Sequence, residues 1–296
     1  MSDATTIQAC AAPTSPRRSR RAWQPFTGNG LSRFADASAS RALGFLGAFA
    51  LTTALVLGWS LHTIGWPVID NAVREFPEQG PGLIRGRFHW PETAPRVLAD
   101  SPHLAVAVRP GDSETLGRTA DLQLELLPGS LRLAGIAGFV EIPWPATADL
   151  PLGRLQARAA WEAWRRPVLA ALIITAAAAM TVVWSALALT LTVPLRIMAF
   201  VLQRHITLGG CWRLSVAACM SASLVLNLGL GGYVMRWLPW PALAAVVVIH
   251  LLVGGLFLIW GLLSRPGKSR SASAPNPFQP GAATARQKKT GNNPFG

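Results

Sequence analysis

Carboxylates are missing from the second half of this sequence. No Asp or Glu occurs between Pro167 and Gly296, although ten Lys or Arg residues do. Over the whole chain only 14% of residues are charged, compared with about 25% in soluble globular domains. The long apolar runs contain no charged residue. This argues against proton- or ion-coupled carriers, because these need an ionisable relay within their spans.

Cysteines and catalytic motifs are also scarce. The three cysteines are Cys10, Cys211 and Cys219, and none lies at 65–166, which excludes a disulfide-stapled secreted domain. The sequence has no HExxH, no GxSxG, no phosphate-binding glycine loop and no Cys or His cluster with metal-ligand spacing. We therefore expect a non-enzymatic protein with no catalytic residues, no cofactor and no metal site.

The basic surplus of the chain, +13 overall, lies outside its middle segment. Residues 65–166 carry eleven Arg and twelve acidic residues and are nearly neutral. The other Lys and Arg residues lie in low-complexity tails and beside apolar runs, not on a face with aromatic readers. This pattern argues against nucleic acid as a partner. It is typical of a membrane protein, in which Lys and Arg remain on the cytoplasmic flanks.

Four apolar runs are long enough to cross a lipid bilayer, for which about 20 residues are needed. We predict transmembrane helices at 42–64, 167–190, 214–235 and 241–263. The first run is longer than a signal-peptide core and no small-x-small cleavage site follows, so we interpret it as an uncleaved anchor. In this arrangement fifteen Lys or Arg residues lie on one side of the membrane, before the first span, between the second and third, and after the fourth. The short turn between the third and fourth spans, on the opposite side, contains only Arg236. This asymmetry predicts cytoplasmic N- and C-termini.

Residues 65–166 then form the only sizeable extracytoplasmic segment. Strand-like patterns occur at Leu83–Trp90, at His103–Pro110 and at Leu122–Ile136, where alternating leucines flank a Pro-Gly-Ser turn as in a hairpin. About a hundred residues can bury a modest core without disulfides. The expected fold class is membrane α+β, with four transmembrane helices and a small antiparallel β-rich extracytoplasmic domain between helices 1 and 2.

The linker between the second and third spans, 191–213, has a helical pattern. Arg196, Gln203 and Arg204 share one side of it, with apolar residues between them. This spacing fits a cytoplasmic interfacial helix with its arginines at headgroup level. A continuation of the second span beyond Pro194 fits the same residues, and the pattern is too short to decide between the two.

We predict disordered cytoplasmic tails at 1–41 and 264–296, because neither has apolar periodicity. The second tail repeats Asn-Pro-Phe, at 276–278 and 293–295. Asn-Pro forms turns that can present the aromatic ring to a partner, but two short matches in such a sequence also arise by chance.

Asn227 and His250 are the polar exceptions inside the predicted spans. Each lies thirteen residues from the cytoplasmic end of its span, so both are expected at the same depth, about 20 Å from that end. An unpaired polar group is costly in hydrocarbon. We therefore predict that Asn227 and His250 form a structural intramembrane polar pair, hydrogen-bonded across the third and fourth spans.

In the β-rich domain, Asp100 and His103 precede Asp112 and Glu114. Carboxylates near a histidine can hold a cation or act as acid and base. Asp and Ser before Pro or Gly more often make turns. We interpret these residues as turn formers, with a site as the alternative.

Two stretches carry a family resemblance. In HITLGGCWRLSVAACM, at His205–Met220, a short loop leads through an aromatic residue and Arg213 into a span. With RGRFHWPETAPRVLADSPHLAVAV, at Arg85–Val108, the sequence resembles uncharacterised bacterial inner-membrane proteins with one N-terminal helix, an extracytoplasmic β domain and a Yip-like three-helix C-terminal block. The resemblance covers residues 42–263. It implies a multi-pass inner-membrane protein but no reaction, and no site residues are carried over from it.

These observations favour a non-enzymatic integral membrane protein of the cell envelope, an interaction or assembly factor. Its extracytoplasmic domain would meet an envelope protein partner or a ligand while the spans anchor it in the lipid bilayer. A channel or permease subunit is the alternative, and a membrane-embedded enzyme is a third candidate. A pocket continuous through the bundle would favour transport. A solid apolar bundle beneath an exposed groove on the β domain would favour the interaction factor.

Overall fold

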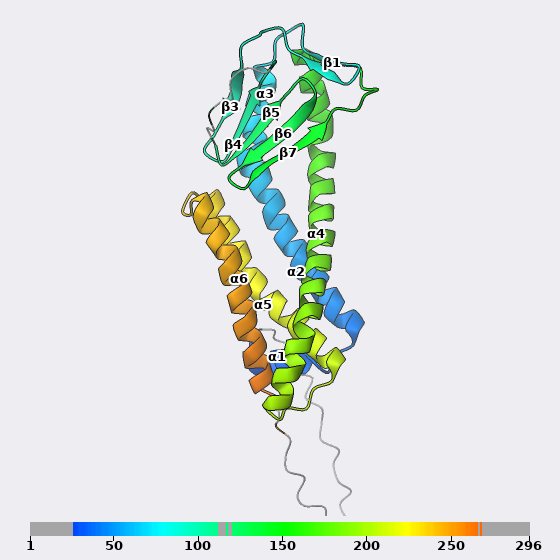
Figure 1. The fold of residues 1–296 in the computed structure, drawn as a ribbon, viewed down its shortest axis with the longest axis vertical. Coiled ribbons are helices and arrows are strands. Elements are labelled where there is room, and N and C mark those ends of the chain that lie inside the picture. Colours follow the sequence, from blue (N-terminus) through cyan, green and yellow to red (C-terminus); the bar gives the residue numbers. More distant parts are fainter. Residues whose placement is uncertain (1–25, 112–116, 118–119, 266, 268–296) are drawn as a thin grey trace, which may run out of the picture.

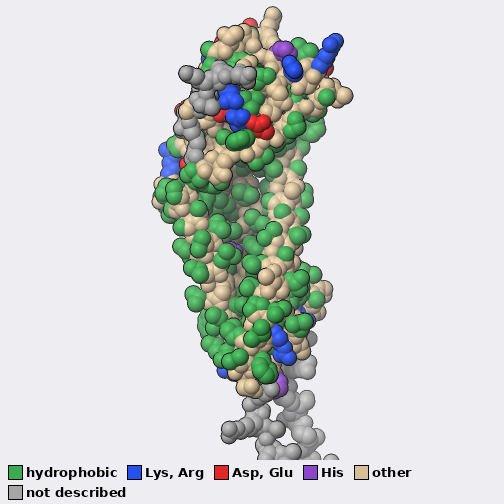
Figure 2. Space-filling model, viewed as in Figure 1, with side chains coloured by type: hydrophobic (Ala, Val, Ile, Leu, Met, Phe, Trp, Pro, Cys, Tyr) green, Lys and Arg blue, Asp and Glu red, His purple; other side chains and the backbone are tan. Residues whose placement is uncertain are grey.

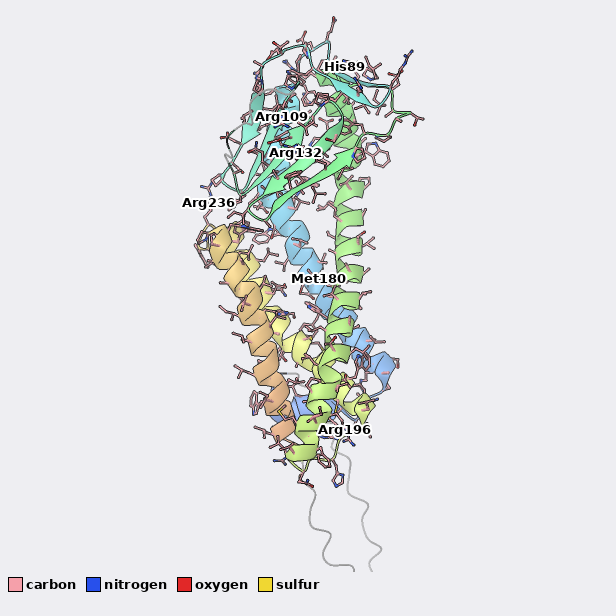
Figure 3. The ribbon with its side chains drawn as sticks, in the orientation of Figure 1. His89, Arg109, Arg132, Met180, Arg196 and Arg236 are labelled. Atoms are coloured by element: carbon pink, nitrogen blue, oxygen red, sulfur yellow. The ribbon has the colours of Figure 1, made fainter. Side chains whose placement is uncertain are left out.

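The computed structural model describes residues 26–111, 117, 120–265 and 267. Four helices in these ranges are long and apolar enough to cross a membrane. A small β domain lies at one end of the helical bundle (Figure 1). We name this end the domain end, and we name the opposite end, where Arg196 lies, the arginine end (Figure 3).

The helices follow the predicted spans. In chain order they are α1 (Gly28–Phe34), α2 (Ala39–Ser60), the π-helical turn η1 (Leu61–Gly65), α3 (Trp66–Arg74), α4 (Arg154–Val201), α5 (Leu208–Val234) and α6 (Trp240–Leu263). α2, η1 and α3 form one continuous helical segment, and each predicted span falls on one such segment. Charged side chains gather at the two ends of the molecule, while the band between them lacks them on the face drawn in Figure 2.

Helix α4 is much longer than the second predicted span. Its 48 residues correspond to about 72 Å at 1.5 Å per residue, whereas the hydrocarbon core of a bilayer is about 30 Å thick. It continues past Pro194 to Val201, so this part of the linker extends the span and forms no separate interfacial helix. At the other end, Trp161 of α4 donates a hydrogen bond to Asp70 of α3.

The N-terminal segment differs from the disordered tail predicted at 1–41. Residues 28–34 form α1, which begins at Thr27, whose hydroxyl accepts from the backbone N–H of Gly30. Leu31 and Phe34, one helical turn apart, are fully buried against α5 and α6 at the arginine end. Two apolar residues in a short segment give too weak a pattern for a sequence-based prediction. Of the second predicted tail only Ser264, Arg265 and Gly267 are described, and both Asn-Pro-Phe repeats lie outside the described residues, as does Cys10.

The β domain contains two sheets. The strands are β1 (Gly82–Ile84), β2 (Arg87–His89), β3 (Arg96–Asp100), β4 (Leu104–Val108), β5 (Leu122–Leu126), β6 (Ser130–Gly135), β7 (Gly138–Pro143) and β8 (Leu150–Pro151). Their order is β3-β4-β5-β6-β7 in the larger sheet and β2-β1-β8 in the smaller one. The predicted leucine hairpin is present, with Leu126 opposite Leu131 across its turn.

One pairing departs from the antiparallel domain that the sequence predicted. Strands β4 and β5 run parallel, with Leu104 opposite Leu122, because the chain returns to the starting end of β4 before β5 begins. Side-chain alternation specifies which face of a strand is buried but not the direction of its neighbour. The antiparallel prediction therefore holds for the other pairs of strands and fails for this one.

Each half of the molecule has its own core. In the β domain, α3 and the first turns of α4 pack against the sheets, burying residues such as Val68, Phe88 and Val108. In the bundle, α5 is the central helix, and every residue from Ser215 to Ser223 is buried. Small residues dominate that stretch, which lets neighbouring helices approach closely.

Candidate functional site

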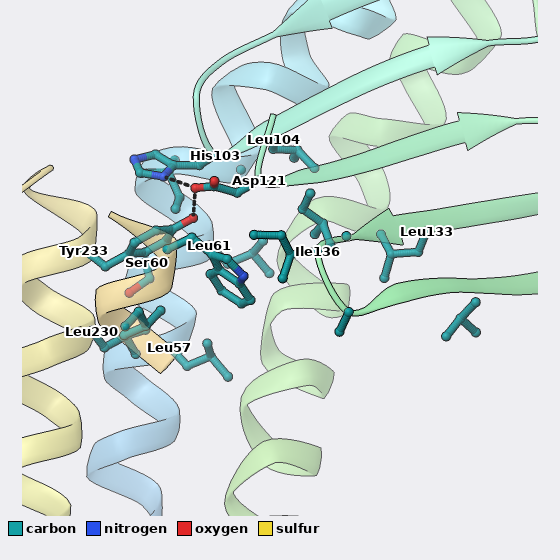
Figure 4. Close-up of a pocket in the computed structure, with 18 of the residues that line it drawn as sticks. Leu57, Ser60, Leu61, His103, Leu104, Asp121, Leu133, Ile136, Leu230 and Tyr233 are labelled. Carbon is teal, nitrogen blue, oxygen red and sulfur yellow. Dashed lines mark hydrogen bonds and ion pairs between the residues drawn. The ribbon is translucent and has the colours of Figure 1, made fainter. Parts of the chain in front are cut away.

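A cavity of about 470 Å³ lies at the domain end, between the larger sheet and the helices. Its walls come from α2 and η1, from the ends of β4 to β7, and from the α5–α6 hairpin (Figure 4). The volume is within the range of about 300–1,000 Å³ that is typical of small-molecule sites. Cavities of this size usually combine an apolar lining with a few polar groups, and this one does too.

The lining is apolar because each wall is formed by apolar side chains of the kind that are buried in lipid or in a protein core. Leu57 and Leu61 lie one helical turn apart on the α2–η1 segment, and Leu230 faces them from α5. On the sheet side, Phe139 and Val140 of β7 complete the wall, although both side chains are more than 60% exposed. Strand β7 is an edge strand, so the cavity borders on an unpaired, apolar sheet edge.

Three polar side chains meet at the rim of the cavity. The hydroxyl of Tyr233, the only tyrosine in the chain, donates a hydrogen bond of 2.8 Å to Oδ2 of Asp121. Nδ1 of His103 lies 3.5 Å from the same oxygen. The rings of His103 and Tyr233 pack edge to face, with centroids 4.4 Å apart. This cluster joins the β domain to the last turn of α5 (Figure 4).

The parallel pairing of β4 and β5 creates this cluster. His103 and Asp121 are the residues immediately before the paired positions Leu104 and Leu122, so the two strands begin side by side. Backbone bonds fix this approach, since the N–H of Asp121 donates to Pro102 O at 3.0 Å and that of Leu122 to His103 O at 3.1 Å. A histidine and a carboxylate eighteen positions apart are thereby brought together.

The structure brings together only part of the alternative site that the sequence indicated in this domain. His103 contributes to the cluster, but Asp100 lies in β3, and Asp112 and Glu114 lie outside the described residues. The partner of His103 is Asp121, which the sequence analysis did not single out. No local pattern connects Asp121 with Tyr233, because 112 positions separate them.

Asn227 and His250 do not form the predicted hydrogen bond. Oδ1 of Asn227 and Nδ1 of His250 are buried and have no hydrogen-bond partner among the described residues. The His250 ring instead lies against Trp184 of α4, with centroids 6.1 Å apart. Depth along a span fixes the level of a side chain but not the helix face from which it projects. This contact gives Trp184 a packing role between α4 and α6, which the sequence alone did not indicate.

The cavity does not continue into the bundle. Its lining reaches no deeper than Leu57 on α2 and Leu230 on α5, and the buried stretch Ser215–Ser223 fills the centre of the bundle beyond. A second cavity, at the arginine end, shares no lining residue with the first. Within the described ranges, no group of three or more His, Cys, Asp or Glu residues could hold a metal ion.

Comparison of the chain with models of known protein families, with characterised proteins and with solved structures finds no match. Chemically, the cavity and its rim can enclose a hydrocarbon chain and offer Asp121, His103 and Tyr233 to a polar group beside it.

Proposed function

We propose that this protein is a non-enzymatic interaction factor of the bacterial cell envelope, and that the cavity at its domain end binds the hydrocarbon chain of an amphiphilic ligand. The observation that carries the proposal is the position of the cavity, between the larger sheet and the ends of three apolar helices. The bundle anchors the protein in the bilayer. The β domain closes over the ligand.

An acyl chain suits this cavity better than a polar ligand does. The helical wall of Leu57, Leu61 and Leu230 continues directly from the apolar band of the bundle, so a chain can pass from the bilayer along α2. The polar cluster at the rim lies on the domain side, where the headgroup of a lipid would lie. Binding then places the hydrocarbon chain of an amphiphile in apolar surroundings and its headgroup beside polar side chains. This avoids the cost of burying a polar group without a partner.

The alternative of a channel or permease subunit receives less support. A passage would require a cavity that continues along the bundle axis, whereas the buried centre of α5 separates the two cavities. The absence of a continuous passage between the two cavities supports the interaction factor over the channel.

We expect Ile136→Glu to weaken binding of a pyrene-labelled phosphatidylcholine by at least about tenfold, because a carboxylate at the cavity wall loses hydration when a chain enters. Ile136 lines the cavity and is 58% exposed, so folding should tolerate the change. Ile142→Glu is the matched control, since Ile142 is 55% exposed on β7 but does not line the cavity. Tryptophan-to-pyrene energy transfer in detergent, with unlabelled lipid as competitor, measures the dissociation constants.

Equal binding by both variants and the unchanged protein would contradict the acyl-chain proposal. If the unchanged protein does not bind the lipid but a photocrosslinker at Ile136 captures an apolar protein segment, the cavity is a protein-docking site instead.

The proposed orientation places the β domain outside the cytoplasm, in the bacterial inner membrane, with both chain ends inside. It follows from the Lys and Arg residues beside the spans, which are retained on the cytoplasmic side. Alkaline phosphatase fused within the β domain, after Pro110, should therefore be active, and fusions after Arg204 or Gly267 should be inactive. Activity at Arg204 together with inactivity at Pro110 would invert the orientation.

A further inference from the structure

The second cavity, at the arginine end, has a volume of about 390 Å³ and a different character from the first. Three arginines line it, Arg196 from α4, Arg204 from the α4–α5 loop and Arg265 from the residues after α6. Asp36 is the one acidic residue of the lining. The cavity therefore holds three guanidinium groups for one carboxylate.

Backbone carbonyls hold these arginines in place. Arg265 bonds both oxygens of Asp36 and also donates to the carbonyls of Ser32 and His205. Arg204 donates through Nη1 to the carbonyl of Arg265. These bonds tie α1, the α4–α5 loop and the end of α6 together. The guanidinium groups are thus fixed before any ligand arrives, which lowers the entropic cost of binding one.

Several N–H groups of the three arginines have no hydrogen-bond partner among the described residues. Among the described residues, the only hydrogen bond of Arg196 runs from Nη1 to the carbonyl of Ile206, at 2.5 Å, which leaves Nε and Nη2 unengaged. Nε of Arg204 and Nε of Arg265 are buried without a hydrogen-bond partner in the described part of the chain. Buried donors of this kind are costly unless a ligand or water accepts from them.

Among the described residues, no second carboxylate lines the cavity. Asp36 already pairs with Arg265, and the sequence contains no Asp or Glu from Pro167 onward. Two positive charges in the cavity therefore have no counter-charge in the described part of the chain. A bound anion with several acceptor oxygens would satisfy both the charge and the unengaged N–H groups.

We propose that this cavity binds the phosphate group of an anionic phospholipid. Arginine suits this role because its planar fork contacts two phosphate oxygens at once. The remaining wall suits a lipid, because Phe200 of α4 lines the cavity and is 68% exposed, next to other apolar α4 residues that face outward. Arg196, which lines the cavity, lies at the arginine end of the bundle (Figure 3), where the headgroups of a bilayer spanned by these helices would lie. This site is independent of the proposed acyl-chain cavity.

The test uses the full chain in detergent with added dioleoyl phosphatidylglycerol or, for comparison, zwitterionic dioleoyl phosphatidylcholine. We expect phosphatidylglycerol to raise the melting temperature and phosphatidylcholine not to. Arg196→Gln should weaken the apparent affinity for phosphatidylglycerol by about tenfold or more, the loss expected for a charge-assisted bidentate contact. Arg196 is exposed and makes only one hydrogen bond among the described residues, so the fold should be retained. Arg236→Gln is the matched control, because it removes the same charge at the domain end (Figure 3).

A second variant, Arg196→Lys, keeps the charge but removes the fork, and it should bind with intermediate affinity. Stabilisation by inorganic phosphate alone, to the same extent as by phosphatidylglycerol, would assign the cavity to a free phosphate and overturn the lipid. An equal loss in Arg196→Gln and Arg236→Gln would overturn the proposal in favour of general surface charge. Equal melting temperatures with the two lipids would also overturn it.

Discussion

Gly229→Leu is expected to disrupt the packing of α5 against α6. A Cβ atom at this position would lie 2.3 Å from Cγ1 of Val246 on α6, so the two helices must move apart. Overpacking of this kind costs about 1–3 kcal/mol and more when backbones shift. The melting temperature in detergent, followed by tryptophan fluorescence, should therefore fall by roughly 2–12 °C, at 2–4 °C per kcal/mol.

The matched control lies two residues further along the same helix. A Cβ at Gly231 meets no atom within 4 Å, so Gly231→Leu should leave the melting temperature nearly unchanged. Equal effects of the two substitutions would mean that leucine disturbs α5 through the helix itself, and that α5 and α6 do not approach as closely as the structure has them.

Phe88→Ala is expected to unfold the β domain under mild conditions. Phe88 is only 4% exposed and lies between Trp90 and Trp144, with ring centroids 6.1 and 6.3 Å away. Truncating a buried Phe to Ala costs about 3–5 kcal/mol, a large part of the 5–15 kcal/mol by which a domain is usually stable. The urea concentration at which trypsin begins to cleave the full chain within the β domain should fall accordingly.

Phe139→Ala provides the same substitution on the surface of the same domain. Phe139 is 64% exposed, and the guanidinium of Arg132 lies 4.7 Å from its ring centroid. A cation–π contact at an exposed site contributes about 0.5–1 kcal/mol, so the urea midpoint should move little. A shift as large as that of Phe88→Ala would show that the domain core is not centred on Phe88.

The membrane helices and the leucine hairpin could be predicted because their signals are local. An apolar run such as that of α6 is long enough to specify a spanning helix by itself. The turn between Leu126 and Leu131 likewise lies between the two strands that it joins. In both cases the residues that carry the pattern are the residues that make the contacts.

The candidate site could not be predicted, because its residues meet only through tertiary structure. Asp121 reaches His103 through the parallel pairing of β4 and β5, and Tyr233 approaches both from a different helix. The Asn227–His250 prediction failed for a related reason. Helix length sets depth, but the rotation of each helix is set by neighbours such as Trp184, which lies on a third helix.

Helix α4 has a mechanical consequence for the whole molecule. Its first turns, with Ala157, belong to the core of the β domain, and Arg196 near its other end lines the arginine cavity. Because α4 is one unbroken helix of about 72 Å, a tilt imposed on it at one end also displaces its other end. If a ligand at either end favours one tilt of α4, the two membrane surfaces become coupled. Thermodynamic linkage then requires the influence to be equal in both directions.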